Sequence, residues 1–254
     1  MLFCTGDTHS DFHRFSMDAF PEQRELNRDD TMIISGDFGG VWYQENSEYI
    51  KKENWWLDWL EDKTYTTVFI DGNHENFDRL YKYPVIEWNG GLVHEIRPHV
   101  LHLMRGEVFT IESKKFFVFG GASSHDIQDG ILDYDDPDWR DQARALEREG
   151  KHMYRVKGLT YWRRELPTQE EMENGWKNLA KHDYKVDFIL SHTPPASVIA
   201  LLGHGLYEQD VLTKYLEEVR ARTDFKTHLM GHMHINKRMN ERDILLYEQI
   251  VRIN

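Results

Sequence analysis

Seven side chains that could bind metal ions occur at widely separated points of the sequence. They are two aspartates, one asparagine and four histidines: Asp7, His9, Asp37, Asn73, His192, His232 and His234. Carboxylate and amide oxygens with imidazole nitrogens, and no thiolate, suit Mn, Fe, Co, Ni or Zn. Seven ligands are too many for one four-coordinate ion, but suit two ions about 3.5–4 Å apart that share a carboxylate. The set predicts a centre of two divalent ions, with manganese as the leading candidate.

Each motif is weak when it is taken alone, because Asp-x-His and Gly-Asp sequences are common in ordinary turns. The joint pattern is more specific, since each motif directly follows a predicted strand. A glycine precedes Asp7, Asp37, Asn73 and His232, and glycine permits tight turns and a close approach of the backbone. We therefore interpret the seven residues as ligands of one site.

Six short apolar runs predict the strands that would position these ligands. They are rich in Val, Ile and Phe, which is typical of strands buried on both faces. The runs cover residues 2–5, 31–35, 66–70, 116–119, 186–190 and 227–230. Ligands of open α/β sheets bind beyond the carboxyl ends of the strands, so residues distant in sequence would converge there.

Helical periodicity between these runs predicts an α/β fold. Apolar residues at spacings of three and four indicate helices over 47–61 and around 212–219. Thr168 with Glu171 predicts a capping box at the start of a third helix, which runs to residue 181.

Two other regions favour antiparallel strands. The runs 93–96, 100–104 and 108–111 are expected to be antiparallel strands joined by short turns such as residues 112–115, and residues 237–253 are expected to form a hairpin. Residues 123–167 are long, acidic at first and then basic and aromatic. We expect a lid-like insertion there, within a single domain of residues 1–254.

Composition excludes several classes of protein. The chain has 254 residues, 31 Lys and Arg, 44 Asp and Glu, and a formal net charge of −13. This charge argues against an extended nucleic-acid surface. Cys4 is the single cysteine, no apolar run approaches the ~18 residues of a membrane span, and no signal peptide is recognisable. We therefore expect a cytoplasmic protein without a membrane partner.

The ordered motifs resemble the signature of the calcineurin-like metallophosphoesterase superfamily, and within it small bacterial and phage proteins similar to serine/threonine phosphatases. The matching motifs are Gly-Asp-Thr-His at 6–9, Gly-Asp at 36–37, Gly-Asn-His-Glu at 72–75, His192, and Gly-His-Met-His at 231–234. The resemblance covers most of the chain. It implies an α+β sandwich: two mixed β-sheets packed face to face and flanked by helices, with the metal site at the carboxyl ends of the central strands.

The resemblance also implies a role for each site residue. Asp7, His9 and His234 would bind one ion, and Asn73, His192 and His232 the other, while Asp37 would bridge the two and His74 would be catalytic. The implied activity is hydrolysis of phosphomonoesters, phosphoproteins included. A bridging hydroxide would attack phosphorus, and His74 would act as the general acid.

Two departures from the family pattern concern this activity. Family members often carry a second aspartate that supports the catalytic histidine, but this chain has Gly40 at that position. His74 therefore needs another orienting partner. Eukaryotic-type protein phosphatases also hold phosphate with arginines beside the second and third motifs, where this chain has glycine and Asp71.

Substrate contacts must then come from elsewhere. Arg14 is one candidate, although a solvated helix start is the simpler interpretation. Arg163 and Arg164, with Arg155 and the aromatic residues between them, could hold phosphate and stack a base. A lid with solvated arginines is the favoured alternative there. Residues 123–126 are expected to border the cleft without binding metal.

Two other functions stay open. A phosphodiesterase or nucleotidase acting on cyclic nucleotides, dinucleoside polyphosphates or short RNA ends would use the same ligands. A non-catalytic scaffold of the same fold is disfavoured by the complete ligand set. The expected partner is a phosphorylated small molecule, a nucleotide or a phosphoprotein. The following histidines are expected to be ordinary strand, loop or surface residues: His94, His99, His102, His152, His182, His204 and His228.

Overall fold

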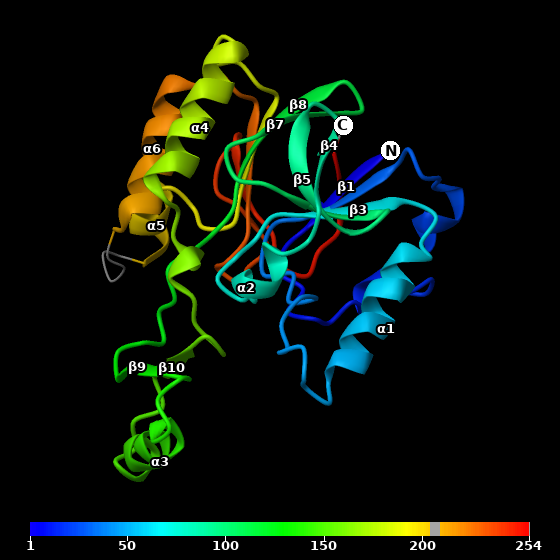
Figure 1. Cartoon of the computed structure of the whole chain (residues 1–254). Helices are drawn as coiled ribbons and strands as arrows, with labels where there is room; N and C mark the ends of the chain where they lie inside the picture. The colour runs from blue at the N-terminus through cyan, green and yellow to red at the C-terminus, as the bar shows by residue number, and fades with distance from the viewer. Residues whose placement is uncertain (204–208, 254) are drawn as a thin grey trace.

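Two mixed β-sheets packed face to face form the framework of the molecule (Figure 1). The computed structural model describes residues 1–203 and 209–253, so His204 lies outside the described residues. The first sheet contains β1 (Leu2–Thr5), β2 (Thr31–Ile34), β3 (Thr66–Phe69), β4 (Val85–Trp88), β5 (Gly91–Arg97), β6 (Val100–Leu103) and β15 (Val251–Ile253). Its order is β15-β1-β2-β3-β6-β5-β4, and β1, β2, β3 and β6 run parallel.

The second sheet has the same plan, with four parallel strands at its centre. It contains β7 (Val108–Ile111), β8 (Lys114–Phe119), β11 (Phe188–Ser191), β12 (Thr227–Met230), β13 (Lys237–Arg238) and β14 (Asp243–Leu245). Its order is β13-β14-β12-β11-β8-β7, and β8, β11, β12 and β14 run parallel. The structure thus confirms the predicted α/β sandwich.

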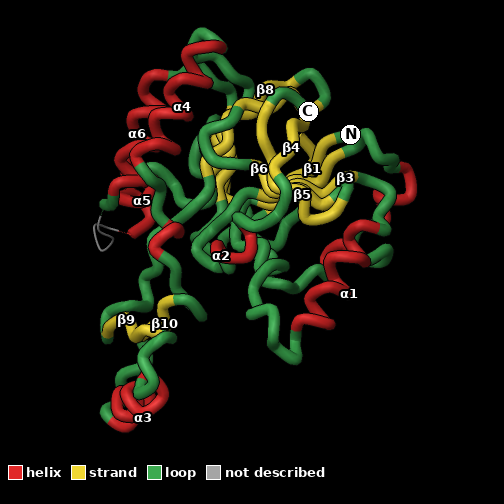
Figure 2. Tube along the Cα trace, in the orientation of Figure 1, coloured by secondary structure: helices red, strands yellow, loops and turns green. Residues whose placement is uncertain are grey.

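Helices cover the outer faces of both sheets (Figures 1 and 2). On the first sheet lies α1 (Ile50–Glu61), and on the second lie α4 (Gln169–Lys181), α5 (Ala196–Gly203) and α6 (Val211–Arg222) (Figure 1). The other described α-helices, α2 (Phe77–Leu80) and α3 (Trp139–Arg148), lie elsewhere (Figure 1). Leu57 of α1 packs on the first sheet, and Leu179 of α4 and Leu216 of α6 pack on the second. Between the sheets, Cys4 and Val118 belong to one shared apolar core. No described helix has both the length and the apolar character needed to cross a membrane.

Most predicted elements are confirmed, including the antiparallel pairing of β5 with β6 and that of β7 with β8 across the predicted turn at 112–115. One predicted pairing is wrong, and the C-terminal hairpin is shorter than predicted. The capping box of Thr168 and Glu171 is present at α4. The predicted antiparallel pairing of 100–104 with 108–111 is absent among the described strands, because β6 pairs in parallel with β3 while β7 pairs with β8 in the other sheet. The chain therefore crosses between the sheets at this point. β13 and β14 form the predicted hairpin, but β15 leaves it and covers the open edge of β1.

The predicted insertion, residues 123–167, projects away from the sandwich (Figures 1 and 2). It contains α3 and a small parallel sheet of β9 (Gly130–Asp133) and β10 (Tyr154–Lys157). Its return segment docks on the first-sheet side, where the Trp162 indole donates to Asp78 at 2.8 Å. The insertion starts directly after β8 of the second sheet and its return segment contacts the first-sheet side, so it connects the two sheets at the carboxyl ends of their parallel strands.

Candidate metal centre

All seven predicted ligands lie in loops that follow parallel strands at their carboxyl ends. Asp7 and His9 follow β1, Asp37 follows β2 and Asn73 follows β3, all in the first sheet. The three remaining histidines follow β11 and β12 of the second sheet: His192, His232 and His234. The parallel pairing of these strands brings the loops of each sheet to the same end, where the two sheets meet.

The donor atoms form two groups that share one carboxylate. Asp7, His9, Asp37 and His234 form the first ligand group. Asp37, His192 and His232 form the second ligand group, to which the sequence adds Asn73. Within each of the two groups of acids and histidines, the donor atoms lie within 4.8 Å of one another. Asp37 thus offers a donor atom to both groups.

Imidazole and carboxylate atoms converge closely in the first ligand group. His9 Nε2 lies 3.0 Å from His234 Nε2, and His234 Nε2 lies 3.2 Å from Asp7 Oδ2. His9 Nε2 is also 3.7 Å from Asp37 Oδ2. The ring of His234 stacks on Tyr247 with centroids 4.7 Å apart, which holds this otherwise half-exposed imidazole in place.

In the second ligand group, each of two side chains is oriented by a hydrogen bond on its far side. His192 Nδ1–H donates to the Ser35 carbonyl at 2.9 Å, which leaves Nε2 directed to Asp37 Oδ1 at 3.4 Å. Asn73 Nδ2 donates to Ser124 Oγ at 3.4 Å. Such outer hydrogen bonds are the usual means of aiming a metal-binding imidazole.

Three buried acceptors at this place have no hydrogen-bond partner: Asp7 Oδ2, Asn73 Oδ1 and His192 Nε2. A buried polar atom without a partner costs about 1–3 kcal/mol. All three atoms are ligand types for divalent transition metals, and a cation among them would satisfy all three. The residues present therefore fit a metal site.

The electrostatics of the cluster favour positive charge. Burial alone would lower the pKa of His192, but Asp37 and Asp7 raise it to about 10. Burial alone would raise the pKa of Asp37, but His192 holds it well below its usual range. The Asp37 carboxylate thus stays ionised and attracts cations.

The backbone of the ligand loops is strained. His9, Asp37, His232 and His234 all have left-handed conformations, with φ of 45°, 43°, 66° and 48°. Such values are uncommon outside glycine and cluster at functional sites. The expected close approach of the backbone is also confirmed, because a Cβ on Gly72 would collide with the Asp37 carboxylate.

His74 lies beside the bridging carboxylate and contacts an arginine of the insertion. Its backbone N–H donates to Asp37 Oδ1 at 2.8 Å, and its Nε2 lies 3.2 Å from Arg155 Nη2. Arg155 is buried, and it donates through Nε to Asp126 Oδ1 at 2.7 Å and through Nη1 to the Thr160 carbonyl at 2.9 Å. Burial lowers the pKa of His74 to about 4. Arg155 is therefore the partner of His74 in a chain that has Gly40 in place of the second aspartate.

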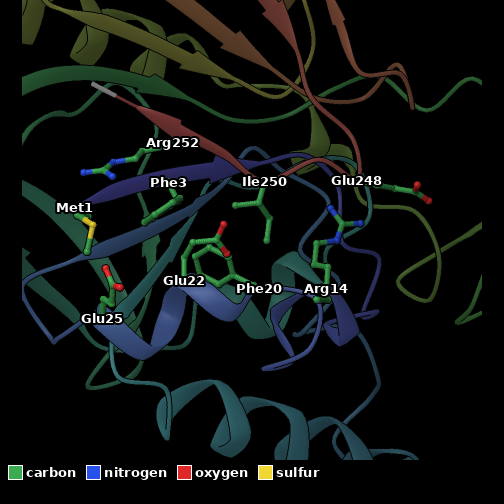
Figure 3. A pocket seen from close by; sticks show the side chains of 10 residues that line it. Met1, Phe3, Arg14, Phe20, Glu22, Glu25, Glu248, Ile250 and Arg252 are labelled. Atoms are coloured by element: carbon green, nitrogen blue, oxygen red, sulfur yellow. The ribbon is translucent and has the colours of Figure 1, made fainter.

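The other three predicted substrate arginines, Arg14, Arg163 and Arg164, have surroundings that differ from those of Arg155. Arg14 donates to the carbonyls of Asp7 and Tyr247 at 2.8 and 2.6 Å, so its guanidinium supports the Asp7 loop from behind. It also lines a pocket with Phe20 and Ile250, which none of the predicted metal ligands lines (Figure 3).

Arg163 and Arg164 are exposed, and the Arg164 guanidinium lies 4.9 Å from the centre of the Tyr81 ring. Substrate contact by Arg14, Arg163 and Arg164 stays a prediction.

Two neighbours of the ligands were not assigned a role from the sequence. Ser124 contacts Asn73, and His125 Nε2 lies 2.9 Å from His232 Nε2. The sequence signal was their position directly after the fourth apolar run, which predicts the border of the cleft but not these contacts.

The arrangement can hold cations between two carboxylates and can present an imidazole and a guanidinium beside them.

Comparison with known proteins adds no family assignment, since neither a protein-family model nor a curated protein matches the chain. The functional interpretation therefore depends on the residues and their geometry.

Proposed function

We propose that the protein is a phosphomonoesterase of the calcineurin-like metallophosphoesterase type, dependent on two divalent metal ions. The observation that carries the proposal is the position of Asp37 in both ligand groups, with His74 next to it. Manganese is the first candidate for the ions, and iron, zinc, cobalt or nickel would suit the same donors. When bound, such ions lower the pKa of water and offset the charge of phosphoryl oxygens.

In this proposal, Arg155 binds a phosphoryl oxygen and His74 protonates the leaving oxygen. Arg155 Nη2 donates to His74 Nε2, so this nitrogen cannot carry a proton while the contact lasts. A phosphoryl oxygen that accepts the Arg155 N–H would release His74 Nε2. The released nitrogen could then take up a proton from water and donate it to the leaving oxygen, which would depart as the alcohol.

The guanidinium favours a monoester over a diester as substrate. A phosphomonoester carries a second negative charge and a third terminal oxygen, and a planar guanidinium recognises such oxygens well. Asp126 and Thr160 fix the guanidinium from the side of the insertion. A phosphodiesterase or nucleotidase would share every metal ligand, so the alternative differs in the use of Arg155.

The test is hydrolysis of a monoester and a diester by the same protein. After treatment with a chelator, the protein is reloaded with Mn²⁺, or in parallel with iron, zinc, cobalt or nickel, and assayed on p-nitrophenyl phosphate and bis-p-nitrophenyl phosphate. We expect activity only with the metal, and a higher kcat/KM on the monoester. A higher kcat/KM on the diester would favour the phosphodiesterase, and no hydrolysis with any of the five metals would favour a scaffold.

The proposed partner is a phosphorylated small molecule, a nucleotide or a phosphoprotein in the cytoplasm. Cys4 is a free, fully buried thiol, which needs no oxidising compartment.

A further inference from the structure

Two consecutive residues after β8 each contact a ligand of the second ligand group. Asn73 Nδ2 donates to Ser124 Oγ, and His125 Nε2 faces His232 Nε2 at 2.9 Å. Both residues belong to the insertion, whereas the ligands themselves belong to loops of the sandwich. The insertion therefore reaches the centre on the side of the second group.

Ser124 determines which atom of the Asn73 amide faces the centre. The Ser124 hydroxyl donates to Glu165 Oε2 at 2.7 Å, and its backbone N–H donates to Glu165 Oε1 at 2.9 Å. Because the hydroxyl hydrogen is taken by this buried carboxylate, only lone pairs of Oγ remain for Asn73. The amide must then offer its NH₂ group to Ser124, and Oδ1 is the atom left for a cation. Oδ1 is indeed buried without a hydrogen-bond partner.

His125 acts on His232 in a similar way. For Nδ1 of His232 to keep its lone pair, Nε2–H of His232 must donate to Nε2 of His125, which accepts. Nδ1 is then the ring nitrogen of His232 that remains for a cation. His192 shows the mirror arrangement, since Ser35 engages Nδ1 and leaves Nε2. A hydrogen bond on the far nitrogen fixes both the tautomer and the direction of the ring.

We propose that Ser124 and His125, with Glu165 behind Ser124, are positioning residues that set the affinity of the second ligand group for its cation. The first ligand group does not depend on them. The inference rests on the metal centre of the proposed function, but not on catalysis. Loss of an outer partner of this kind typically weakens metal binding about 10- to 100-fold.

The experiment measures binding of Mn²⁺ to the metal-free full chain by isothermal titration calorimetry. The Asn73→Ala variant identifies the binding step that belongs to the second group. We expect Ser124→Ala and His125→Ala to weaken that same step about 10- to 100-fold and to change the other step less than about twofold. Glu165→Gln is expected to weaken it too, because a Gln amide can donate to Ser124 Oγ and free the hydroxyl hydrogen. Ser123→Ala is the matched control.

A second readout separates positioning from loss of folding. The absorption spectrum of bound Co²⁺ reports the ligand geometry. It should change in His125→Ala and be restored in His125→Gln, whose amide oxygen can accept the hydrogen bond from His232 Nε2–H. Equal weakening of both steps, no weakening of either, or the same effect in Ser123→Ala would overturn the inference. A protein that binds two ions but hydrolyses no ester would overturn the proposed function and leave this inference standing.

Discussion

Replacement of Arg155 by alanine tests the substrate side of the proposed site. The guanidinium lies 3.2 Å from His74, and a hydrogen bond between it and a phosphoryl oxygen would be charge-assisted. Removal of such a bond costs about 1.5–3 kcal/mol. At 1.36 kcal/mol per factor of ten, kcat/KM on p-nitrophenyl phosphate should fall about 10- to 150-fold. The loss on the diester should be smaller, about fivefold or less, because a diester carries one negative charge instead of two.

The same structure predicts that Arg155→Ala stays folded. The side chain of Asp126, which pairs with Arg155, is 49% exposed and keeps its hydration when the arginine is removed. A partly exposed pair contributes about 1 kcal/mol or less, which corresponds to a fall in Tm of about 2–4 °C. Arg155→Lys keeps the charge without the planar fork, so its loss of activity should be intermediate. Arg148→Ala, an exposed arginine of α3 in the same insertion, is the control.

The assay compares kcat/KM for both esters in all variants at saturating Mn²⁺. An equal fall on monoester and diester would show that Arg155 only supports the fold of the site. Unchanged activity on both esters would show that it does not touch the substrate at all. Either result refutes the reasoning that assigns a phosphoryl contact to this arginine.

Three further predictions concern His74, the buried ion pair and a buried histidine. His74→Ala should keep both metal ions but lose at least about tenfold in rate on esters with poor leaving groups, measured by steady-state kinetics beside metal analysis. Arg105→Met should destabilise the fold by about 3–5 kcal/mol in urea unfolding, because it leaves the buried Asp71 carboxylate without the guanidinium that contacts it at 2.9 Å. The control is Lys185→Met, which removes one partner of an exposed ion pair and should leave stability unchanged. Burial lowers the pKa of His228 to about 3, so the unfolded chain binds an extra proton below its ordinary pKa of about 6.5. Stability should therefore fall as the pH falls from 6.5 towards 3, by about 2 kcal/mol at pH 5, and His228→Gln should lose this contribution in urea unfolding at pH 7 and 5.

Sequence periodicity was sufficient for the elements that carry the ligands. The six apolar runs are buried strands because their residues face apolar neighbours on both sides, and this requirement is visible in a run of four residues. The parallel pairing of β6 with β3 was not predictable in this way, although the turn at 112–115 did indicate the pairing of β7 with β8. The sheet that a strand joins depends on which edge is open in three dimensions, and an apolar run does not show this.

The residues that contact the ligands also depend on the three-dimensional fold, and they were therefore hard to predict from the sequence. The metal ligands could be proposed because their chemical types are rare in combination and follow each strand. Arg155 could be named only as one of several candidate phosphate-binding arginines, and His125 only as a residue bordering the cleft, since an arginine or histidine in a polar insertion is more often solvated. Their contacts with His74 and His232 depend on how the insertion folds back over the carboxyl ends of the parallel strands.

The backbone conformations of the ligands link the fold of the two sheets to the arrangement of the site. Four ligand residues adopt left-handed φ values, which histidine and aspartate tolerate better than most residues but still at a cost in free energy. The same loops bury acceptors that have no hydrogen-bond partner. Neither feature stabilises the chain by itself, so the surrounding sheets and the outer hydrogen bonds that Ser35 and Ser124 accept must hold the loops in place. A rigid sandwich that supports strained, unsatisfied loops at one end is what a preorganised cation site requires, because the ordering cost is met during folding rather than on binding.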